Sequence, residues 1–158
     1  MPFNTLFRVL CVDDDLDACE MLSALLKAYR MEVTCAHSAV EAWPLIKAEC
    51  FDLYLLDGWL PGLDGFEFCR QIRKFDSITP ILFYSGAAYD ADKRLGIASG
   101  ANAYVAKPDV EGLIKTITHL IAKAKAGHFA AAWAGSRQIR TNATVNFPPS
   151  FSFEAARN

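Results

Sequence analysis

Three consecutive carboxylates, Asp13, Asp14 and Asp15, directly follow the short apolar run at residues 9–12. Two like charges about 4 Å apart repel each other by roughly 4 kcal/mol at an effective dielectric constant near 20. We therefore expect this cluster to be either well solvated or neutralised by a cation. Three more side chains that could do chemistry each follow a separate apolar run further along the chain: Asp57, Ser85 and Lys107.

The hydrophobic pattern places these side chains at the ends of predicted strands. Short apolar runs alternate with longer amphipathic ones, which is typical of a parallel sheet covered by helices. The pattern predicts strands at 7–12, 32–36, 52–57, 80–84 and 103–106, and helices at 16–29, 39–49, 65–74, 89–99 and 109–125.

Five strand–helix units of this length predict an α/β fold with a doubly wound, five-stranded parallel sheet. In such sheets, ligands bind outside the carboxyl ends of the strands. The acidic run, Asp57, Ser85 and Lys107 follow strands one, three, four and five, so they should converge on one crevice. Only the second strand contributes no candidate.

Local signals mostly agree with these boundaries. Ser38 and Glu41 form a capping box for the second helix, and Gly127 follows the last helix as a C-cap would. Pro44 disagrees, because it removes a backbone hydrogen bond and should kink the second helix or shorten its start.

Length and composition suggest one domain with an appendage. The 158 residues, 53% of them hydrophobic, can bury one core, which we assign to residues 1–126. Residues 127–158 form an aromatic-rich C-terminal extension that folds back on the domain or binds a partner. It is too short for a separate effector domain and shows no helix-turn-helix pattern. The net charge of −2 also argues against direct binding to nucleic acid.

The cysteines and the apolar runs indicate a cytoplasmic protein. The five cysteines are odd in number and include no CxxC pair, so we interpret them as reduced core residues. The sequence shows neither a secretory signal pattern nor an uncharged apolar run of about 18 residues. Export and membrane insertion are therefore not expected.

Four segments carry a resemblance to a known family: VLCVDDD, LYLLDGWLPGLDG at 53–65, ILFYSGA at 81–87 and GANAYVAKP at 100–108. Together they resemble the receiver domain of bacterial two-component response regulators, in particular the single-domain chemotaxis type. The resemblance extends over residues 5–125, with all elements in order. It implies a flavodoxin-like (βα)5 fold with strand order 2-1-3-4-5.

The resemblance implies that Asp57 accepts a phosphoryl group from a phosphohistidine, with Mg²⁺ bound in the acidic cluster. Asp14 would ligate the metal directly, Asp13 would act directly or through water, and the backbone carbonyl of Trp59 would be a further ligand. The chemistry agrees, because Mg²⁺ prefers hard carboxylate oxygens and phosphoryl transfer depends on charge neutralisation. Asp15 lies outside the acidic pair and should begin the first helix instead.

The resemblance also assigns the remaining site residues. Lys107 would contact the phosphoryl group as a point charge, aimed by a cis peptide bond before Pro108, and the Ser85 hydroxyl would donate to another phosphoryl oxygen. Phosphorylation would draw Ser85 inward and leave space for Tyr104. The surface of the fourth helix, fifth strand and fifth helix would then change shape.

Several positions depart from the common family pattern. Ser85 stands where threonine is frequent, and Leu60 stands where methionine is usual. Trp59 and Ala87 occupy positions that in this family influence the access of hydrolytic water. A bulky apolar ring at position 59 offers no group to orient that water, so we expect a long-lived phosphoryl state.

These features predict a response regulator that catalyses only its own phosphorylation and dephosphorylation and signals through protein contacts. Its expected partners are a sensor histidine kinase or a histidine phosphotransfer protein and an unidentified downstream protein, with a phosphorylation-linked homodimer as a further option. One alternative is a receiver-like scaffold that is rarely phosphorylated. Another is a phosphohydrolase of the haloacid dehalogenase type, which would need an aspartate where this chain has Trp59.

Overall fold

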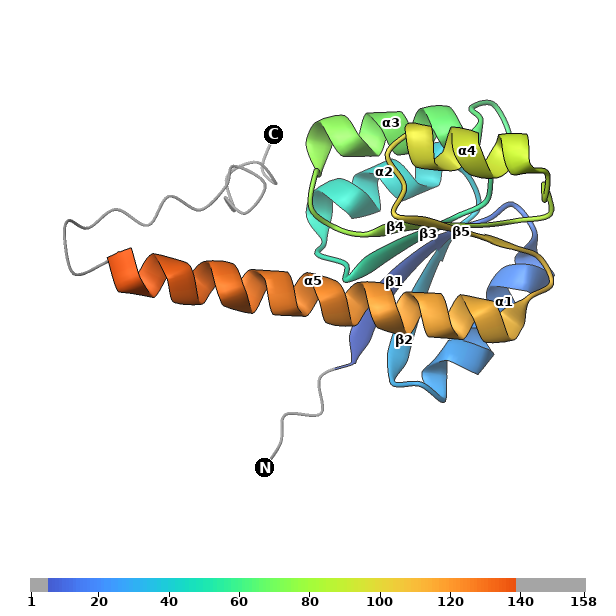
Figure 1. The fold of residues 1–158 in the computed structure, drawn as a ribbon. Coiled ribbons are helices and arrows are strands. Elements are labelled where there is room, and N and C mark those ends of the chain that lie inside the picture. The colour runs from blue at the N-terminus through green and yellow to red at the C-terminus, as the bar shows by residue number, and fades with distance from the viewer. Residues whose placement is uncertain (1–5, 139–158) are drawn as a thin grey trace.

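The computed structural model describes residues 6–138, except for the side chains of residues 129 and 132–138. Five strands and five helices alternate along this part of the chain (Figure 1). The strands are β1 Phe7–Val12, β2 Met31–Ala36, β3 Leu53–Leu56, β4 Ile81–Ser85 and β5 Ala103–Ala106. The helices are α1 Leu16–Lys27, α2 Ala39–Ala48, α3 Gly65–Phe75, α4 Asp90–Ala98 and α5 Val110–Gln138.

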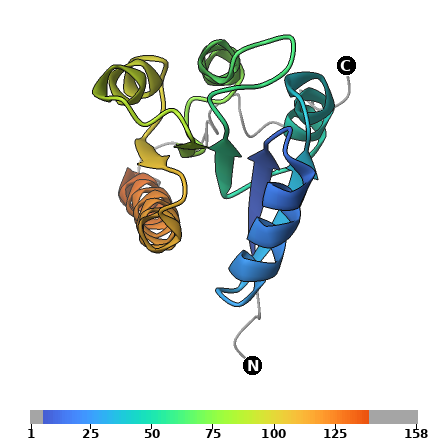
Figure 2. The same cartoon turned by 90° about the vertical axis from the view of Figure 1, so that its right-hand side faces the viewer.

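The strands form one parallel sheet in the order β2-β1-β3-β4-β5. Helices α2, α3 and α4 cover one face, and α1 and α5 cover the other (Figures 1 and 2). This arrangement confirms the predicted doubly wound α/β fold and its strand order.

The apolar runs form strands because both faces of the sheet are covered. Every residue of β3 and β4 is buried, as are the last four residues of β1. Leu10, Leu56 and Phe83 point into the core beneath α2 and α3. Leu55 and Leu82 point into the second core, beneath α1 and α5. Burial on both faces explains why these runs are continuously apolar rather than alternating.

The register of the strands brings the site residues to one edge of the sheet. Val12 of β1 is paired with Leu56 of β3, so the residues that follow them, Asp13 and Asp57, are neighbours. The Asp57 N–H donates to the carbonyl of Val12 at 2.9 Å. On the other side, the N–H of Lys107 donates to the carbonyl of Ser85 at 2.9 Å.

Two of the helices at this edge begin at carboxylates. Asp15 caps α1 by accepting hydrogen bonds from the N–H groups of Asp17 and Ala18, at 3.0 and 3.2 Å. Asp64 caps α3 by accepting one from Glu67 at 2.7 Å. The prediction that Asp15 begins the first helix is therefore confirmed.

Helix α2 begins where the sequence predicted, so Pro44 does not shorten its start, and a kink at Pro44 stays a prediction. The Ser38 side chain caps the helix by accepting from the N–H of Glu41 at 3.1 Å, as predicted. The helix then begins at Ala39 and continues through Pro44 to Ala48. Its start is not shortened, because the cap and the buried side chains of Ala42 and Ile46 hold the helix in place despite one lost backbone bond.

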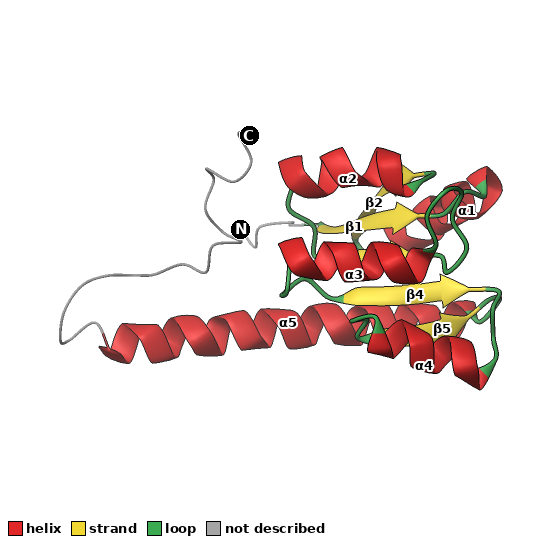
Figure 3. Ribbon diagram, turned by 90° about the horizontal axis from the view of Figure 1, so that it is seen from above, coloured by secondary structure: helices red, strands yellow, loops and turns green. Residues whose placement is uncertain are grey.

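The predicted end of the last helix is wrong. Helix α5 does not stop at Gly127 but continues to Gln138, past the amino ends of the strands (Figure 3). A glycine inside a helix costs only about 1 kcal/mol relative to alanine, and several alanines flank this one. The assignment of residues 127–158 to a separate extension stays a prediction, and residues 139–158 lie outside the described part of the chain.

The cysteine thiols within residues 6–138 are free. Cys11, Cys19 and Cys69 are buried, as expected for core residues, whereas Cys35 is half-buried and Cys50 is exposed. None of the helices between residues 6 and 138 combines the length and the apolar character needed to cross a lipid bilayer.

We predict that Gly127→Ala stabilises α5. A Cβ at this position meets no atom within 4 Å, and alanine is favoured over glycine inside a helix by about 1 kcal/mol. Hydrogen exchange of the amides around residue 127 should slow, and far-UV ellipticity should show more helix. Gly62→Ala is the matched control, because Gly62 has a φ of +80° and alanine there should lower the free energy of unfolding by about 1 kcal/mol. Loss of helix in Gly127→Ala would mean that Gly127 is a C-cap after all.

Candidate functional site

Three carboxylates meet at the carboxyl edge of the sheet. Oxygen atoms of Asp13, Asp14 and Asp57 all lie within 4.8 Å of one another. Asp13 is buried, Asp57 is half-buried and Asp14 is exposed. The cluster is therefore anchored in the protein on one side and open to solvent on the other.

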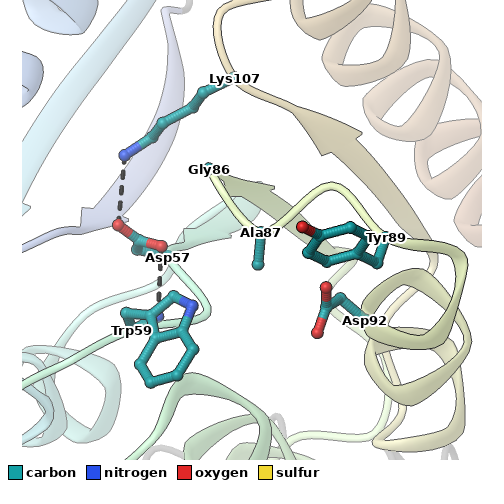
Figure 4. A pocket seen from close by; sticks show the side chains of 7 residues that line it. All are labelled: Asp57, Trp59, Gly86, Ala87, Tyr89, Asp92 and Lys107. Atoms are coloured by element: carbon teal, nitrogen blue, oxygen red, sulfur yellow. Dashed lines mark hydrogen bonds and ion pairs between the residues drawn. The ribbon is translucent and has the colours of Figure 1, made fainter.

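Lys107 supplies the positive charge that this cluster needs. Its Nζ lies 2.6 Å from Oδ2 of Asp13 and 3.2 Å from Oδ2 of Asp57 (Figure 4 shows the second contact). Burial opposes the charged ammonium, but the hydrogen bond to Asp13 and the charges of Asp57 and Asp13 outweigh it. The pKa of Lys107 is therefore raised above its ordinary value, and the side chain is cationic at neutral pH. The peptide bond between Lys107 and Pro108 is cis, as the resemblance implied.

Backbone groups hold the two inner carboxylates in place. The N–H of Asp15 donates to Oδ1 of Asp13 at 2.9 Å, and the N–H of Trp59 donates to Oδ1 of Asp57 at 3.2 Å. Gly65 at the start of α3 is packed so closely that a Cβ there would lie 2.0 Å from the carbonyl oxygen of Asp57. The first turn of α3 thus fixes the backbone on which Asp57 stands.

Ser85 and Tyr104 meet at Ala87, next to the acidic cluster. Ser85 is fully buried, and its Oγ accepts a hydrogen bond from the N–H of Ala87 at 3.4 Å. The Tyr104 hydroxyl donates to the carbonyl of Ala87 at 2.5 Å. Burial raises the pKa of Tyr104, contact with the Ser85 hydroxyl opposes this effect, and the charges of Asp92 and Asp57 add to it. The serine and the tyrosine of the predicted switch are therefore in contact.

The Tyr104 ring is held between two elements. It stacks on Phe83 with ring centroids 5.7 Å apart. Gly96 of α4 lies against both rings, and a Cβ there would come within 2.8 Å of Tyr104 and 3.1 Å of Phe83. The tyrosine already lies against Ser85 and Ala87 in this structure, whereas the sequence suggested that it enters this space only after phosphorylation.

An open pocket of about 520 Å³ lies over this edge, and Asp57 and Lys107 are part of its wall. Its other lining residues come from the loop after β3, from the segment between β4 and α4, and from the first turn of α4. They are Trp59, Gly86, Ala87, Tyr89 and Asp92 (Figure 4). Trp59 therefore lies at the site, as predicted, although its role as a metal ligand through the backbone carbonyl stays a prediction.

Sequence reasoning missed Tyr89 and Asp92 as residues of the pocket. Neither directly follows a strand, and a single tyrosine or aspartate near a helix start is common. Tyr89 is the N-cap residue of α4 but makes no capping bond through its side chain. A tyrosine in place of the usual capping residues was the one signal that could have marked this position.

The donor set fits a hard divalent cation. All three candidate side chains offer carboxylate oxygens, and the exposed face of the cluster leaves room for water and for a phosphoryl group. Mg²⁺ is typically held in this way, by one or two carboxylates with the remaining positions filled by water and phosphate. Asp13, Asp14 and Asp57 would hold such an ion.

Comparison with known proteins identifies the family. Residues 9–118 match the response regulator receiver domain family. The chain belongs to this family and contains the receiver domain of a two-component response regulator.

Individual relatives agree with this assignment. The transcriptional regulatory protein YvrH of Bacillus subtilis (strain 168) is 41% identical over 102 residues, which are 63% of this chain and 42% of that protein. The chemotaxis response regulator CheY4 of Vibrio cholerae is 32% identical with a TM-score of 0.69, over 73% of this chain and 99% of that one. The beryllofluoride-activated NtrC4 receiver domain dimer is 30% identical with a TM-score of 0.70, over 74% of this chain and 98% of that one. The chain thus spans less than half of the length of YvrH.

We predict that Lys107→Gln destabilises the protein in the absence of divalent cations. The substitution leaves Asp13 buried without its counter-charge, which should lower the free energy of unfolding by about 2 kcal/mol in urea with chelator present. Lys115→Gln is the matched control, because Lys115 pairs with Glu111 on the exposed surface of α5 and should cost less than about 0.5 kcal/mol.

The pH dependence of this difference follows from the raised pKa of Lys107. A lysine with a raised folded-state pKa contributes stability fully below its unfolded pKa of about 10.4 and loses it as the pH rises through the folded value. The difference between wild type and Lys107→Gln should therefore be constant near neutrality and shrink only in strong base. Equal stability of the two proteins at pH 7 would contradict the pairing.

Proposed function

We propose that this chain is a phosphoacceptor receiver that takes a phosphoryl group from a phosphohistidine onto Asp57. One observation carries this proposal: Asp57 is the carboxylate that belongs both to the acidic cluster and to the wall of the open pocket, with Lys107 beside it. A group entering the pocket meets Asp57 where a metal ion and an ammonium can both neutralise its charge.

The proposed reaction is a displacement at phosphorus. An oxygen of Asp57 attacks the phosphorus of the donor, the P–N bond breaks, and its electron pair returns to the imidazole nitrogen of the donor. Lys107 Nζ, now on Asp13 and Asp57, would turn to the phosphoryl oxygens as the charge moves there. Bound Mg²⁺ would supply further neutralisation of the attacking and transferred oxygens.

We infer that Ala87 connects the phosphoryl group with the output face. The Ser85 hydroxyl would leave the weak 3.4 Å bond to Ala87 and donate to a phosphoryl oxygen. The carbonyl of Ala87 already holds the hydroxyl of Tyr104. Movement of this residue would therefore change the packing of Tyr104 against Gly96 and with it the surface formed by α4, β5 and α5.

The proposed partners follow from this chemistry. A sensor histidine kinase or a histidine phosphotransfer protein would be the donor, and a protein docking on α4, β5 and α5 would be the target. The relative solved as an activated receiver dimer supports a phosphorylation-linked homodimer as an alternative. The free thiols fit the reducing bacterial cytoplasm.

The rival functions have less support. A haloacid dehalogenase-type phosphohydrolase needs a second aspartate two residues after its nucleophile, and Trp59 stands there. We propose that the chain turns over no metabolic substrate and that its catalysis is limited to its own phosphorylation and dephosphorylation. A scaffold that is rarely phosphorylated would keep the site geometry without the reaction.

We predict that acetyl phosphate with Mg²⁺ phosphorylates the wild-type protein on Asp57. Intact mass should rise by one phosphoryl group, and the increase should be absent in Asp57→Ala and when Mg²⁺ is removed with chelator. Asp17→Asn is the matched control, because Asp17 is an exposed aspartate in the first turn of α1 and lies outside the acidic cluster. An unmodified wild type would favour the scaffold, and an equal increase in Asp57→Ala would mean that another residue accepts the phosphoryl group.

A second prediction concerns the Ser85 hydroxyl. Ser85→Ala should slow phosphorylation by about tenfold, because one hydrogen bond to a charged oxygen is lost, and should abolish the change of the Tyr104 ring signals on adding beryllofluoride and Mg²⁺. Ser85→Thr keeps the hydroxyl and should behave like wild type in both assays. The measurements are a time course of intact mass and NMR spectra of labelled tyrosine. Unchanged Tyr104 signals in all three proteins would refute the proposed coupling.

A further inference from the structure

Two aromatic rings at the mouth of the pocket have no part in the phosphoryl transfer step proposed above. Trp59 is 70% exposed and Tyr89 is 81% exposed, yet both line the same pocket as Asp57. Figure 4 shows them on opposite sides of Ala87, which contributes only a methyl group to the space between them. Aromatic side chains stack on other flat rings, so these two exposed rings offer flat faces to a ligand beside Asp57.

Asp92 adds a negative charge to this mouth. It lies in the first turn of α4, is half-buried and lines the pocket beside Tyr89 (Figure 4). Within residues 6–138, its carboxylate accepts no hydrogen bond and forms no ion pair, although Lys93 and Arg94 follow it directly. The pocket thus combines two rings with a carboxylate that has free acceptor positions.

We propose that Trp59, Tyr89 and Asp92 bind the imidazole ring of the phosphohistidine donor and select it over donors that have no ring. The proposal rests on the proposed function, because it names the residues that receive the leaving group of that reaction. The complementarity is one of shape and charge: the rings stack on the imidazole, and the carboxylate faces the N–H that the ring carries on its second nitrogen.

The proton balance of the transfer gives Asp92 its role. The reactive donor ring is phosphorylated on one nitrogen and protonated on the other, and so carries a positive charge. When the P–N bond breaks, its electron pair stays on the ring, and the product is neutral imidazole that keeps its proton. Asp92 would accept a hydrogen bond from that N–H throughout, which holds the ring in its protonated, better leaving form. No proton is transferred to the protein.

The test compares two small donors on the full chain. Monophosphoimidazole offers the ring, and acetyl phosphate offers the same phosphoryl group without it. For each variant the readout is the ratio of the two phosphorylation rates, followed by intact mass at saturating Mg²⁺. We expect Trp59→Ala, Tyr89→Ala and Asp92→Asn each to lower this ratio by about 3- to 10-fold relative to wild type.

Two matched variants separate ring binding from general damage to the site. Trp59→Phe keeps an aromatic face and should restore most of the wild-type ratio. Asp90→Asn removes a carboxylate from the same turn of α4, but Asp90 is not part of the pocket wall, so the ratio should stay at the wild-type value. Trp59, Tyr89 and Asp90 are exposed and Asp92 is half-buried at the surface, so we expect all these variants to fold.

The outcomes distinguish the two proposals. If the substitutions change both rates by the same factor, the aromatic rings only shape access to Asp57, and the ring-binding inference is overturned while the proposed function stands. If wild type accepts a phosphoryl group from neither donor, the proposed function is wrong and this inference falls with it. If wild-type ratios persist in all variants while binding of a partner protein is lost, the rings form a protein-docking surface instead.

Discussion

The site depends on the neutralisation of buried negative charge by Lys107. Asp13 is 3% exposed, and a carboxylate at such a position is costly unless a cation lies next to it. Lys107, 94 residues away along the chain, meets this need and reaches Asp57 at the same time. The pair therefore ties the end of β5 to the ends of β1 and β3, and any fold that separated these ends would leave the charge unpaired.

The parallel sheet is what makes this meeting possible. Pairing of Val12 with Leu56 sets Asp13 beside Asp57, and a shift of the register by one residue would turn one of the two carboxylates toward the opposite face. Close packing of α3 against the end of β3 then fixes the position of the Asp57 backbone. The 2.0 Å approach that a Cβ at Gly65 would make to Asp57 shows how little space separates the start of α3 from the acceptor.

The sequence was sufficient to predict the sheet and the central site residues, because both follow from one periodic signal. Runs buried on both faces are continuously apolar, and the residue after each run must lie at the same edge. Signals that rest on a single residue were weaker. Gly127 was expected to end the last helix, but its propensity cost is small against the alanines around it. Tyr89 and Asp92 reach the pocket through the path of the loop after β4, which leaves no periodic trace in the sequence.

Strand β5 gives a physical reason why a change of charge at Asp57 would reach α4. Lys107 follows the last residue of this four-residue strand, and Tyr104 lies within it. The strand and the residue after it thus carry both Lys107, which neutralises the carboxylates, and the Tyr104 ring, which packs on Phe83 and Gly96. Ala87, which follows β4, is hydrogen-bonded to both Ser85 and Tyr104. It therefore forms a second connection between the site and the tyrosine. Under the proposed function, a change of charge at Asp57 would act on Lys107 and on Ser85 together, and α4, which packs on Tyr104, is the element whose packing we expect to change.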